Sequence, residues 1–316
     1  MSLTAVQREA CYASLRTHAR TFSLASRFLS AQAADHAAGV YAWCRRADDA
    51  IDLAPPREHE SALERLRDEL ALVYGDRDLD DPVLGGFQMV VRERGIRRIY
   101  CEELLNGMAM DAEDARYRTL QDLLVYCYRA AGTVGLMMAH VLGVRGDDAL
   151  PAAAHLGIAM QLTNIVRDVA EDHERGRCYL PDALLGAETA ARIRAHFGRS
   201  FPAETQAAVG TARQILLDHA DRYYASADVG LRALDGRSAL AIEVARRGYA
   251  EIGRVVERRG VAHVAGRATV STARKLSIAA GAAVRVTAGL PRRLKTRFQP
   301  IVPRMQLEYS DVLLEA

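Results

Sequence analysis

The sequence has little of what marks a β-sheet protein or a disulfide-rich one. Aromatic residues make up 6% of its 316 residues. No run alternates between apolar and polar positions as a strand does, so a sheet is not expected. The five cysteines are an odd number at irregular spacing. That argues against a disulfide frame or a zinc knuckle and is typical of reduced cytosolic thiols.

An excess of charge of one sign and a long uncharged apolar run are also missing. The 42 Lys and Arg residues nearly balance the 40 Asp and Glu residues, and a net charge of +2 argues against a nucleic-acid binder. No charge-free apolar stretch is long enough to predict a transmembrane helix, and the polar residues near the start predict no signal peptide. We therefore expect a cytoplasmic protein; no oligomeric state is predicted.

The sequence is rich in helix-forming residues, and half of it is hydrophobic, which is enough for a sizeable core. Helical periodicity recurs between Pro and Gly breakers. The expected helices cover residues 4–28, 33–53, 58–75, 82–94, 97–112, 119–143, 149–171, 203–232, 236–260 and 272–289. No repeat or composition break precedes residue 290. We therefore expect one all-α catalytic domain over residues 1–290 and a basic C-terminal tail over residues 291–316.

A first acidic cluster lies within one of these helical patterns. The residues that share one stripe of this helix, at spacings of four, three and four, are Tyr41, Arg45, Asp48 and Asp52. Asp49 lies one position off the stripe. Such a stripe is often only the solvated face of a helix. The surrounding sequence has few of the usual solubilising Glu and Lys residues, however, which favours a semi-buried charged site.

A second cluster repeats this geometry more than a hundred residues later. The residues of its stripe, at spacings of three, four and four, are Gln161, Asn164, Asp168 and Asp172. Taken singly, Gln161 and Asn164 could equally be hydrogen-bonding core residues. The stripe supplies oxygen ligands without His or Cys. This indicates that it binds a hard cation such as Mg²⁺ and argues against a zinc site.

Two matched stripes predict a cation between them. Carboxylates held close together without one would raise each other's pKa, and a diphosphate alone would be repelled. Mg²⁺ reverses both effects, and nearby arginines can hold phosphate oxygens directly. A diphosphate stabilised in this way can leave an allylic carbon. The resulting carbocation then requires a dry apolar pocket.

Two further features leave alternatives open. Gly132 and Gly135 each cost about 1 kcal/mol relative to Ala inside a helix, so something must compensate. Either two helices approach closely at the glycines, or the backbone there faces a substrate. The loop that leads to Tyr179 and Pro181 is either a plain connection or a cover that excludes water from the metal site.

These segments together resemble the squalene/phytoene synthase family over roughly residues 10–280. The motifs that carry the resemblance are Tyr41-Ala-Trp-Cys-Arg45 running into Asp48-Asp49-Ala-Ile-Asp52, Tyr126-Cys-Tyr128-Arg-Ala-Ala-Gly132-Thr-Val-Gly135, Gln161-Leu-Thr-Asn164-Ile-Val-Arg167-Asp168-Val-Ala-Glu-Asp172, and Gly176-Arg177-Cys-Tyr179-Leu-Pro181. The first motif and the stretch from Gly107-Met-Ala-Met-Asp111 to Arg116-Tyr117 look most like bacterial members that make phytoene.

The resemblance implies an isoprenoid-synthase-type helical bundle around a central apolar cavity. It implies that two geranylgeranyl diphosphates join head to head through prephytoene diphosphate to give phytoene, a carotenoid precursor, with Mg²⁺ or a substituting Mn²⁺ and without NADPH. The alternative is a squalene, presqualene diphosphate or dehydrosqualene synthase that acts on farnesyl diphosphate. A non-catalytic member would be expected to lose aspartates from one stripe. A terpene cyclase or a trans-prenyltransferase also uses paired Asp motifs, but the third and fourth motifs argue against both.

The resemblance also implies roles for single residues. Those expected to carry Mg²⁺ are Asp48, Asp52, Asn164, Asp168 and Asp172. Those expected to bind substrate, largely through diphosphate, are His18, Thr21, Phe22, Ser23, Arg45, Gln161, Arg167, Tyr249 and Arg267. The family more often has Ser where Thr21 stands. Tyr41 and released diphosphate are the candidates for the proton acceptor.

The C-terminal region differs from the rest in charge. Residues 258–307 contain no acidic residue, whereas Lys and Arg accumulate there. A solvated basic helix and tail would explain this pattern. The alternatives are contact with diphosphate or peripheral contact with anionic lipid headgroups at the inner face of a membrane.

Overall fold

A computed structural model describes residues 2–18, 20–113, 115–144, 146–199, 201–289 and 301, but not the side chains of residues 18, 20 and 21. Its α-helices are α1 (Ala5–His18), α2 (Arg20–Ser26), α3 (Ala31–Asp52), α4 (His59–Val73), α5 (Pro82–Arg94), α6 (Arg98–Ala112), α7 (Leu120–Cys127), α8 (Thr133–Val141), α9 (Leu150–Glu174), α10 (Asp182–Leu185), α11 (Ala187–Ala195), α12 (Gln206–Ala227), α13 (Gly236–Arg259) and α14 (Thr272–Ala288). Short 3₁₀ turns are η1 (Pro56–Glu58), η3 (Asp147–Ala149), η4 (Ala203–Thr205) and η5 (Asp228–Ala233), and η2 (Tyr128–Gly132) is a π-helical turn.

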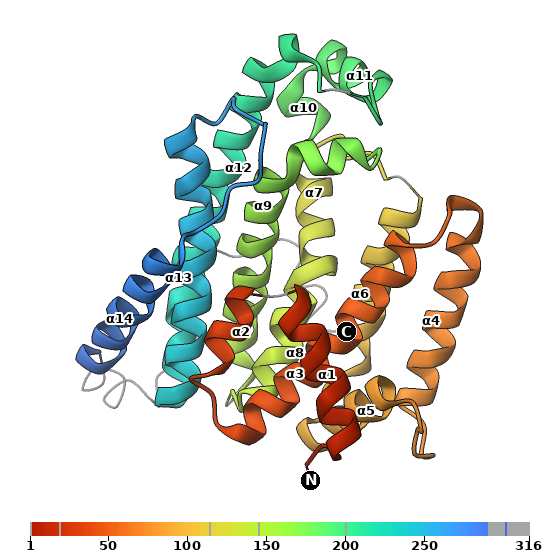
Figure 1. The fold of residues 1–316 in the computed structure, drawn as a ribbon, viewed down its shortest axis with the longest axis vertical. Coiled ribbons are helices and arrows are strands. Elements are labelled where there is room, and N and C mark those ends of the chain that lie inside the picture. Colours follow the sequence, from red (N-terminus) through yellow and green to blue (C-terminus); the bar gives the residue numbers. More distant parts are fainter. Residues whose placement is uncertain are drawn as a thin grey trace.

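The predicted all-α class is confirmed, because the described residues contain no strand. The long helices form a bundle with α9 at its centre, where it packs against α8, α12 and α13 (Figure 1). The segment Asp147–Glu174 is long and apolar enough to cross a membrane by those criteria alone. Within the fold, 72% of its most apolar window is buried, which is the environment of a core helix.

Helix α3 presents the first acidic stripe to the interior because its opposite face is anchored in the core. Ser30 caps its first turn by accepting a hydrogen bond from the backbone N–H of Ala33. On the anchored face, the ring of Trp43 stacks on Phe87 at 4.5 Å, and Ile51 is 1% exposed. The charged stripe is therefore held in one orientation.

The glycines of the central helices allow close backbone contact. A Cβ atom on Gly135 would lie 2.2 Å from the carbonyl oxygen of Ala153, and one on Gly157 would lie 2.1 Å from that of Ala131. Close helix approach therefore accounts for Gly135, although this residue also lines the central cavity. At Gly132 the chain leaves the π-helical turn, a type of turn that often accompanies functional sites.

The predicted helices differ from the observed ones mainly after α9. The expected series left residues 172–202 without a helix, but α9 continues to Glu174 and is followed by α10 and α11. Both later helices are short, and Pro181 and Gly186 flank α10, so their periodicity is weak. The tail over residues 291–316 lies outside the described residues except for Ile301, and the boundary at residue 290 stays a prediction.

Candidate active site

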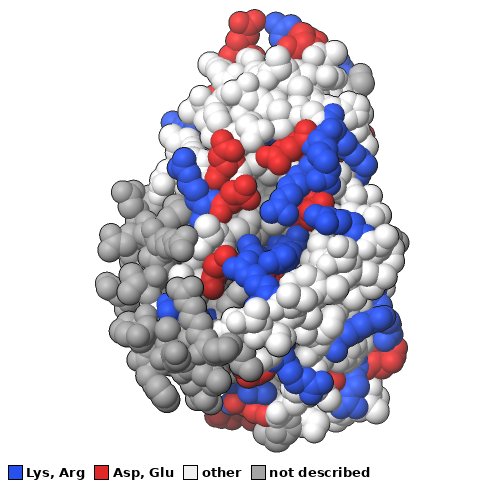
Figure 2. Space-filling view, turned by 90° about the vertical axis from the view of Figure 1, so that its left-hand side faces the viewer, with Lys and Arg blue, Asp and Glu red and all other residues white. Residues whose placement is uncertain are grey.

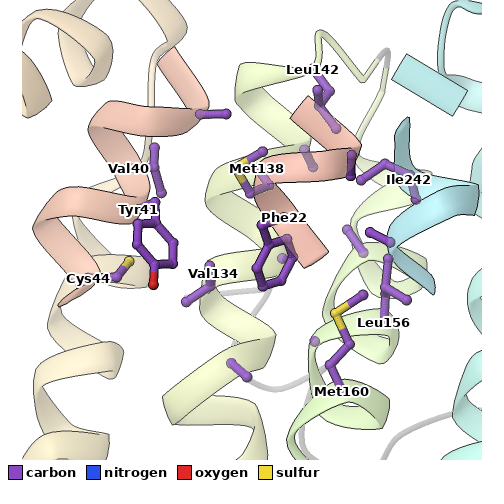
Figure 3. A pocket seen from close by; sticks show the side chains of 18 of the residues that line it. Phe22, Val40, Tyr41, Cys44, Val134, Met138, Leu142, Leu156, Met160 and Ile242 are labelled. Carbon is purple, nitrogen blue, oxygen red and sulfur yellow. The ribbon is translucent and has the colours of Figure 1, made fainter. Parts of the chain in front are cut away.

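An apolar cavity of about 400 Å³ lies inside the bundle. Side chains from α2, α3, α8, α9 and α13 line it, among them Phe22, Tyr41, Met138, Leu156 and Ile242 (Figure 3). The family resemblance implied a central apolar cavity of this kind. Its large size and few polar groups suit a long hydrocarbon ligand.

Both predicted stripes reach this one cavity. Arg45 and Asp48 line it from α3, and Gln161 and Asn164 line it from α9. On both helices these polar residues are the cavity-lining residues nearest the C-terminal end of the helix. The cavity is therefore charged at one end and apolar along the rest of its length. One face of the molecule is hollowed, with acidic and basic side chains interleaved around the hollow (Figure 2).

Arg45 forms ion pairs with two aspartates at the first stripe. The Arg45 Nη1 atom lies 2.8 Å from Asp48 Oδ2, and the same guanidinium contacts Asp49. Asp49 therefore supports the stripe through Arg45. Burial, together with the charge of Asp52, raises the pKa of Asp48 to about 6.

The second stripe has its own arginines. The Asp168 carboxylate accepts a hydrogen bond from Arg167 Nε at 2.6 Å, and Arg267 Nε lies 3.1 Å from it. Burial and the neighbouring charge of Asp168 raise the pKa of Asp172 to about 8. The Asn164 Oδ1 atom is buried and has no hydrogen-bond partner in the part of the chain that the structure describes.

The loop after α9 connects the two stripes. Arg177 Nη1 lies 2.6 Å from Asp52 Oδ1, across 125 positions of sequence, and its charge also lowers the pKa of Asp172. Arg175 approaches the same Asp52 carboxylate at 3.6 Å. This loop, which follows the helix of the second stripe, therefore contacts the first stripe at Asp52.

Sequence reasoning missed a buried cluster around Asp111. This carboxylate accepts hydrogen bonds from Tyr179 Oη at 2.7 Å and from Tyr126 Oη at 3.0 Å, and the two rings stack at 5.0 Å. Burial raises its pKa to about 6, and its charge acts on both Asp48 and Asp172. The three residues lie in motifs that carried the family resemblance, but no role was predicted for them.

The other predicted substrate residues fall into three groups. The Phe22 ring lies 5.4 Å from Tyr249 and 6.5 Å from Tyr41, and all three line the cavity. Ser23 lies on α2, where its carbonyl accepts a hydrogen bond from Ser26, and it is not among the described residues that line the cavity. The side chains of His18 and Thr21 lie outside what the structure describes.

The donor set fits a cation that protein ligands share with a substrate. Within the described ranges, no three Asp, Glu, His or Cys side chains are grouped closely enough to hold a metal by themselves. Mg²⁺ keeps several waters and commonly combines one or two carboxylates with substrate phosphates. The partnerless amide oxygen of Asn164 and the arginine-paired carboxylates suit such a site.

Comparisons with known proteins agree with this geometry. Residues 15–274 match the family model described as squalene/phytoene synthase. The 15-cis-phytoene synthase of Enterobacter agglomerans is 38% identical over 295 residues, covering 89% of this chain and 98% of that protein. The phytoene synthase of Rhodobacter capsulatus is 37% identical over 300 residues, covering 94% of this chain and 85% of that protein.

Solved structures show the same architecture. A dehydrosqualene synthase aligns with a TM-score of 0.78 and 26% identity, covering 89% of this chain and 97% of that one. A squalene synthase from Alicyclobacillus acidocaldarius aligns with a TM-score of 0.69 and 24% identity, covering 80% and 94%. The expected isoprenoid-synthase-type fold is thus confirmed.

The chain therefore belongs to the squalene/phytoene synthase family. It is a prenyltransferase of the phytoene synthase type.

Proposed function

We propose that this chain joins two geranylgeranyl diphosphates head to head, through prephytoene diphosphate, to give phytoene. The observation that carries the proposal is one apolar cavity whose polar end is lined by Arg45 and Asp48 from the first stripe and by Gln161 and Asn164 from the second. Relatives named phytoene synthase that cover most of the chain are 37–38% identical to it. The dehydrosqualene synthase structure, at 26% identity, is more distant. These comparisons favour the C20 substrate over the C15 one.

The proposed metal site draws on both stripes. Mg²⁺, or Mn²⁺ in its place, would be held by Asp48, Asp52, Asn164, Asp168 and Asp172 and would supply positive charge to a departing diphosphate. Arg45, Arg167 and Arg267, each paired with an aspartate of a stripe, would bind diphosphate oxygens directly. Phe22 and Tyr41 help to close the apolar part of the cavity, so that water is kept from a carbocation.

The end of the reaction is proton loss, and no reductant is needed, so no NADPH requirement is proposed. Tyr41 lines the cavity, and burial raises its pKa to about 12. Its hydroxyl is therefore neutral at physiological pH and is a weak acceptor on its own. Released diphosphate is the better candidate to take the proton.

Product analysis tests the proposal. Purified protein is incubated with geranylgeranyl or farnesyl diphosphate, with Mg²⁺ or EDTA, and with or without NADPH, and the hydrocarbon is identified by mass. We expect phytoene from the C20 substrate with Mg²⁺ alone and no product with EDTA. A C30 hydrocarbon from farnesyl diphosphate, with no C40 product, would instead identify the alternative activity.

The raised pKa of Asp172 predicts a pH-dependent response to metal. In the folded protein without metal this carboxyl keeps its proton up to about pH 8, whereas an unfolded chain loses it near pH 4. The stability that this proton contributes is present at low pH and is lost as the pH rises through that window. Mg²⁺ with diphosphate binds the ionised form. We therefore expect them to raise the unfolding temperature more at pH 8 than at pH 6.

Scanning fluorimetry in EDTA and in Mg²⁺ with inorganic diphosphate measures this effect. Asp172→Asn should flatten the dependence on pH, while Glu174→Gln, an exposed position on the same helix, should keep it. Equal shifts of the wild-type protein at both pH values would show that Asp172 does not titrate in this way.

We also propose a cytoplasmic location with peripheral contact at an anionic membrane. Helix α14 exposes Leu276 (60%) and Val284 (71%) on one side, and the acid-free region around it is basic. Leu276→Glu combined with Val284→Glu should reduce sedimentation with anionic vesicles severalfold. Leu72→Glu, at an exposed apolar position on α4, is the control. Equal binding by all three proteins would contradict the membrane contact.

A further inference from the structure

A buried arginine without an acidic partner lies next to the second stripe. Arg213 on α12 is 3% exposed, and no described carboxylate forms an ion pair with it. Its guanidinium donates instead to backbone carbonyls: Nε to Val166 at 2.9 Å, and Nη1 to Val261 at 2.5 Å and His263 at 3.0 Å. Burial lowers its pKa to about 10, so it remains charged at neutral pH.

The carbonyls that Arg213 binds belong to two separate parts of the site. Val166 precedes Arg167 and Asp168 on α9. Val261 and His263 lie in segment 260–271, which connects α13 to α14 without a helix or strand and passes close to α12 (Figure 1). That segment carries Arg267, whose Nε lies 3.1 Å from Asp168 Oδ1. One buried guanidinium thus joins the helix of the second stripe to the segment that brings an arginine to it.

A second contact holds the same segment against α12. Gly210 lies one helical turn before Arg213. A Cβ atom on Gly210 would lie 3.0 Å from the Cα, Cβ and N atoms of Ala262. The backbone of α12 therefore meets the segment directly, between the two segment carbonyls, those of Val261 and His263, that Arg213 binds. The steric contact and the hydrogen bonds independently define one docking position.

A buried guanidinium is an unusual choice for packing alone. Burying a charge is unfavourable unless hydrogen bonds compensate, and here only neutral carbonyls do so. Arginine has five donors in a rigid planar fork, so it can hold carbonyls from two chain segments at a fixed separation. A lysine would present a single ammonium group on a flexible stem and would hold that separation less well.

We propose that Arg213 is a positioning residue that docks segment 260–271 on α9 and so fixes Arg267 at Asp168. The inference rests on the proposed function, because Arg267 matters there as a diphosphate contact. Arg213 is not among the described residues that line the cavity, so we expect it not to touch substrate. Its effect on diphosphate binding passes through Arg267, whereas its effect on the segment does not depend on any reaction.

Hydrogen exchange and a double-mutant cycle test the proposal. In Arg213→Met, amides of residues 260–271 should exchange about tenfold faster or more, because the docked state loses three hydrogen bonds. Binding of inorganic diphosphate with Mg²⁺, measured by calorimetry, should weaken by about tenfold to a hundredfold in Arg267→Ala, the effect of losing one charged contact. Adding Arg213→Met to Arg267→Ala should weaken diphosphate binding little further.

Two more variants keep the test decisive. Gly210→Ala pushes Ala262 away without removing a polar group. It should therefore weaken diphosphate binding when Arg267 is present and have little effect when Arg267 is already replaced by Ala. This test remains available even if Arg213→Met does not fold. Tyr224→Phe is the matched control. It removes the 3.0 Å hydrogen bond between α12 and Thr163 on α9 but does not touch the segment. It should leave both segment exchange and diphosphate binding close to wild type.

Three outcomes would overturn the proposal: unchanged exchange of residues 260–271 in both Arg213→Met and Gly210→Ala, fully additive losses with Arg267→Ala, or an equal loss in Tyr224→Phe. Failure of the proposed function would look different. The wild-type protein would then make no phytoene, while the exchange response of the segment would persist.

Discussion

Replacing Asp168 by Asn is expected to lower turnover of geranylgeranyl diphosphate by a factor of about a thousand or more, the loss typical of removing a charge that stabilises a transition state. Asp168 lies where Arg167 and Arg267 converge. The amide preserves the shape of the side chain but removes the negative charge that a divalent cation needs. Both arginines remain to bind diphosphate, so the loss should fall mainly on kcat.

Steady-state kinetics and circular dichroism measure this effect. Glu174→Gln on the same helix is the matched control, because that side chain is exposed and lies outside the stripe. It should retain wild-type turnover. Asp168→Asn with near-normal turnover would remove Asp168 from the proposed metal site. Loss of helix content in this variant would attribute its inactivity to unfolding, in which case Asp48→Asn on α3 repeats the test.

Replacing Ala153 by Phe is expected to change which substrate the cavity accepts. Along α9, Ala153 lies eleven residues before Asn164, about 16 Å from the charged end at 1.5 Å per residue. Both residues line the cavity. A phenyl ring at this depth takes the space of the last part of a C20 chain and leaves the part that a C15 chain fills. Turnover of geranylgeranyl diphosphate should fall by about a hundredfold, consistent with several apolar groups left unburied.

Competition between the two substrates measures this change. Farnesyl diphosphate should be used at least as well by Ala153→Phe as by the wild-type protein, so that the ratio of C40 to C30 product reverses. Ala153→Ser controls for substitution at this position and should keep the wild-type ratio. Equal losses of turnover on both substrates would mean that the ring blocks the cavity for both chains and that the depth at Ala153 does not determine chain length.

Patterns within a single helix were predictable from the sequence. The stripe of Arg45 and Asp48, and that of Asn164 and Asp168, follow from spacings of three and four residues, because the geometry of an α-helix is fixed. In the structure, Arg45 and Asp48 from one stripe and Gln161 and Asn164 from the other line the same cavity. The roles of the individual side chains remain predictions.

Contacts between distant parts of the chain were not predictable in this way. Tyr179 binds Asp111 across 68 positions, and Arg177 reaches Asp52 across 125, so no local period reveals either pair. Arg213 is harder still to find from sequence, because its partners are backbone carbonyls, which any residue type supplies. Its only sequence signal is that it is the one charged residue within positions 206–217 of α12.

The role of the two helix-interior glycines could be decided only from packing. The spacing of Gly132 and Gly135 indicated that something unusual compensates for two helix-interior glycines, but it left two explanations open. The carbonyl of Ala153 next to Gly135 shows close helix approach, and the same glycine faces the cavity. Close helix approach is therefore observed at Gly135, and the same residue lies on the wall of the cavity, where it would meet a bound substrate.

The position of the metal tests the central claim most directly. Crystals grown with Mn²⁺ and inorganic diphosphate would locate the ions by their anomalous scattering. We predict ions between the two stripes, bound to the diphosphate and to carboxylate oxygens of both α3 and α9, either directly at about 2.0–2.2 Å or through one bridging water. Ions bound at one stripe only, or diphosphate held by arginines far from both, would contradict it.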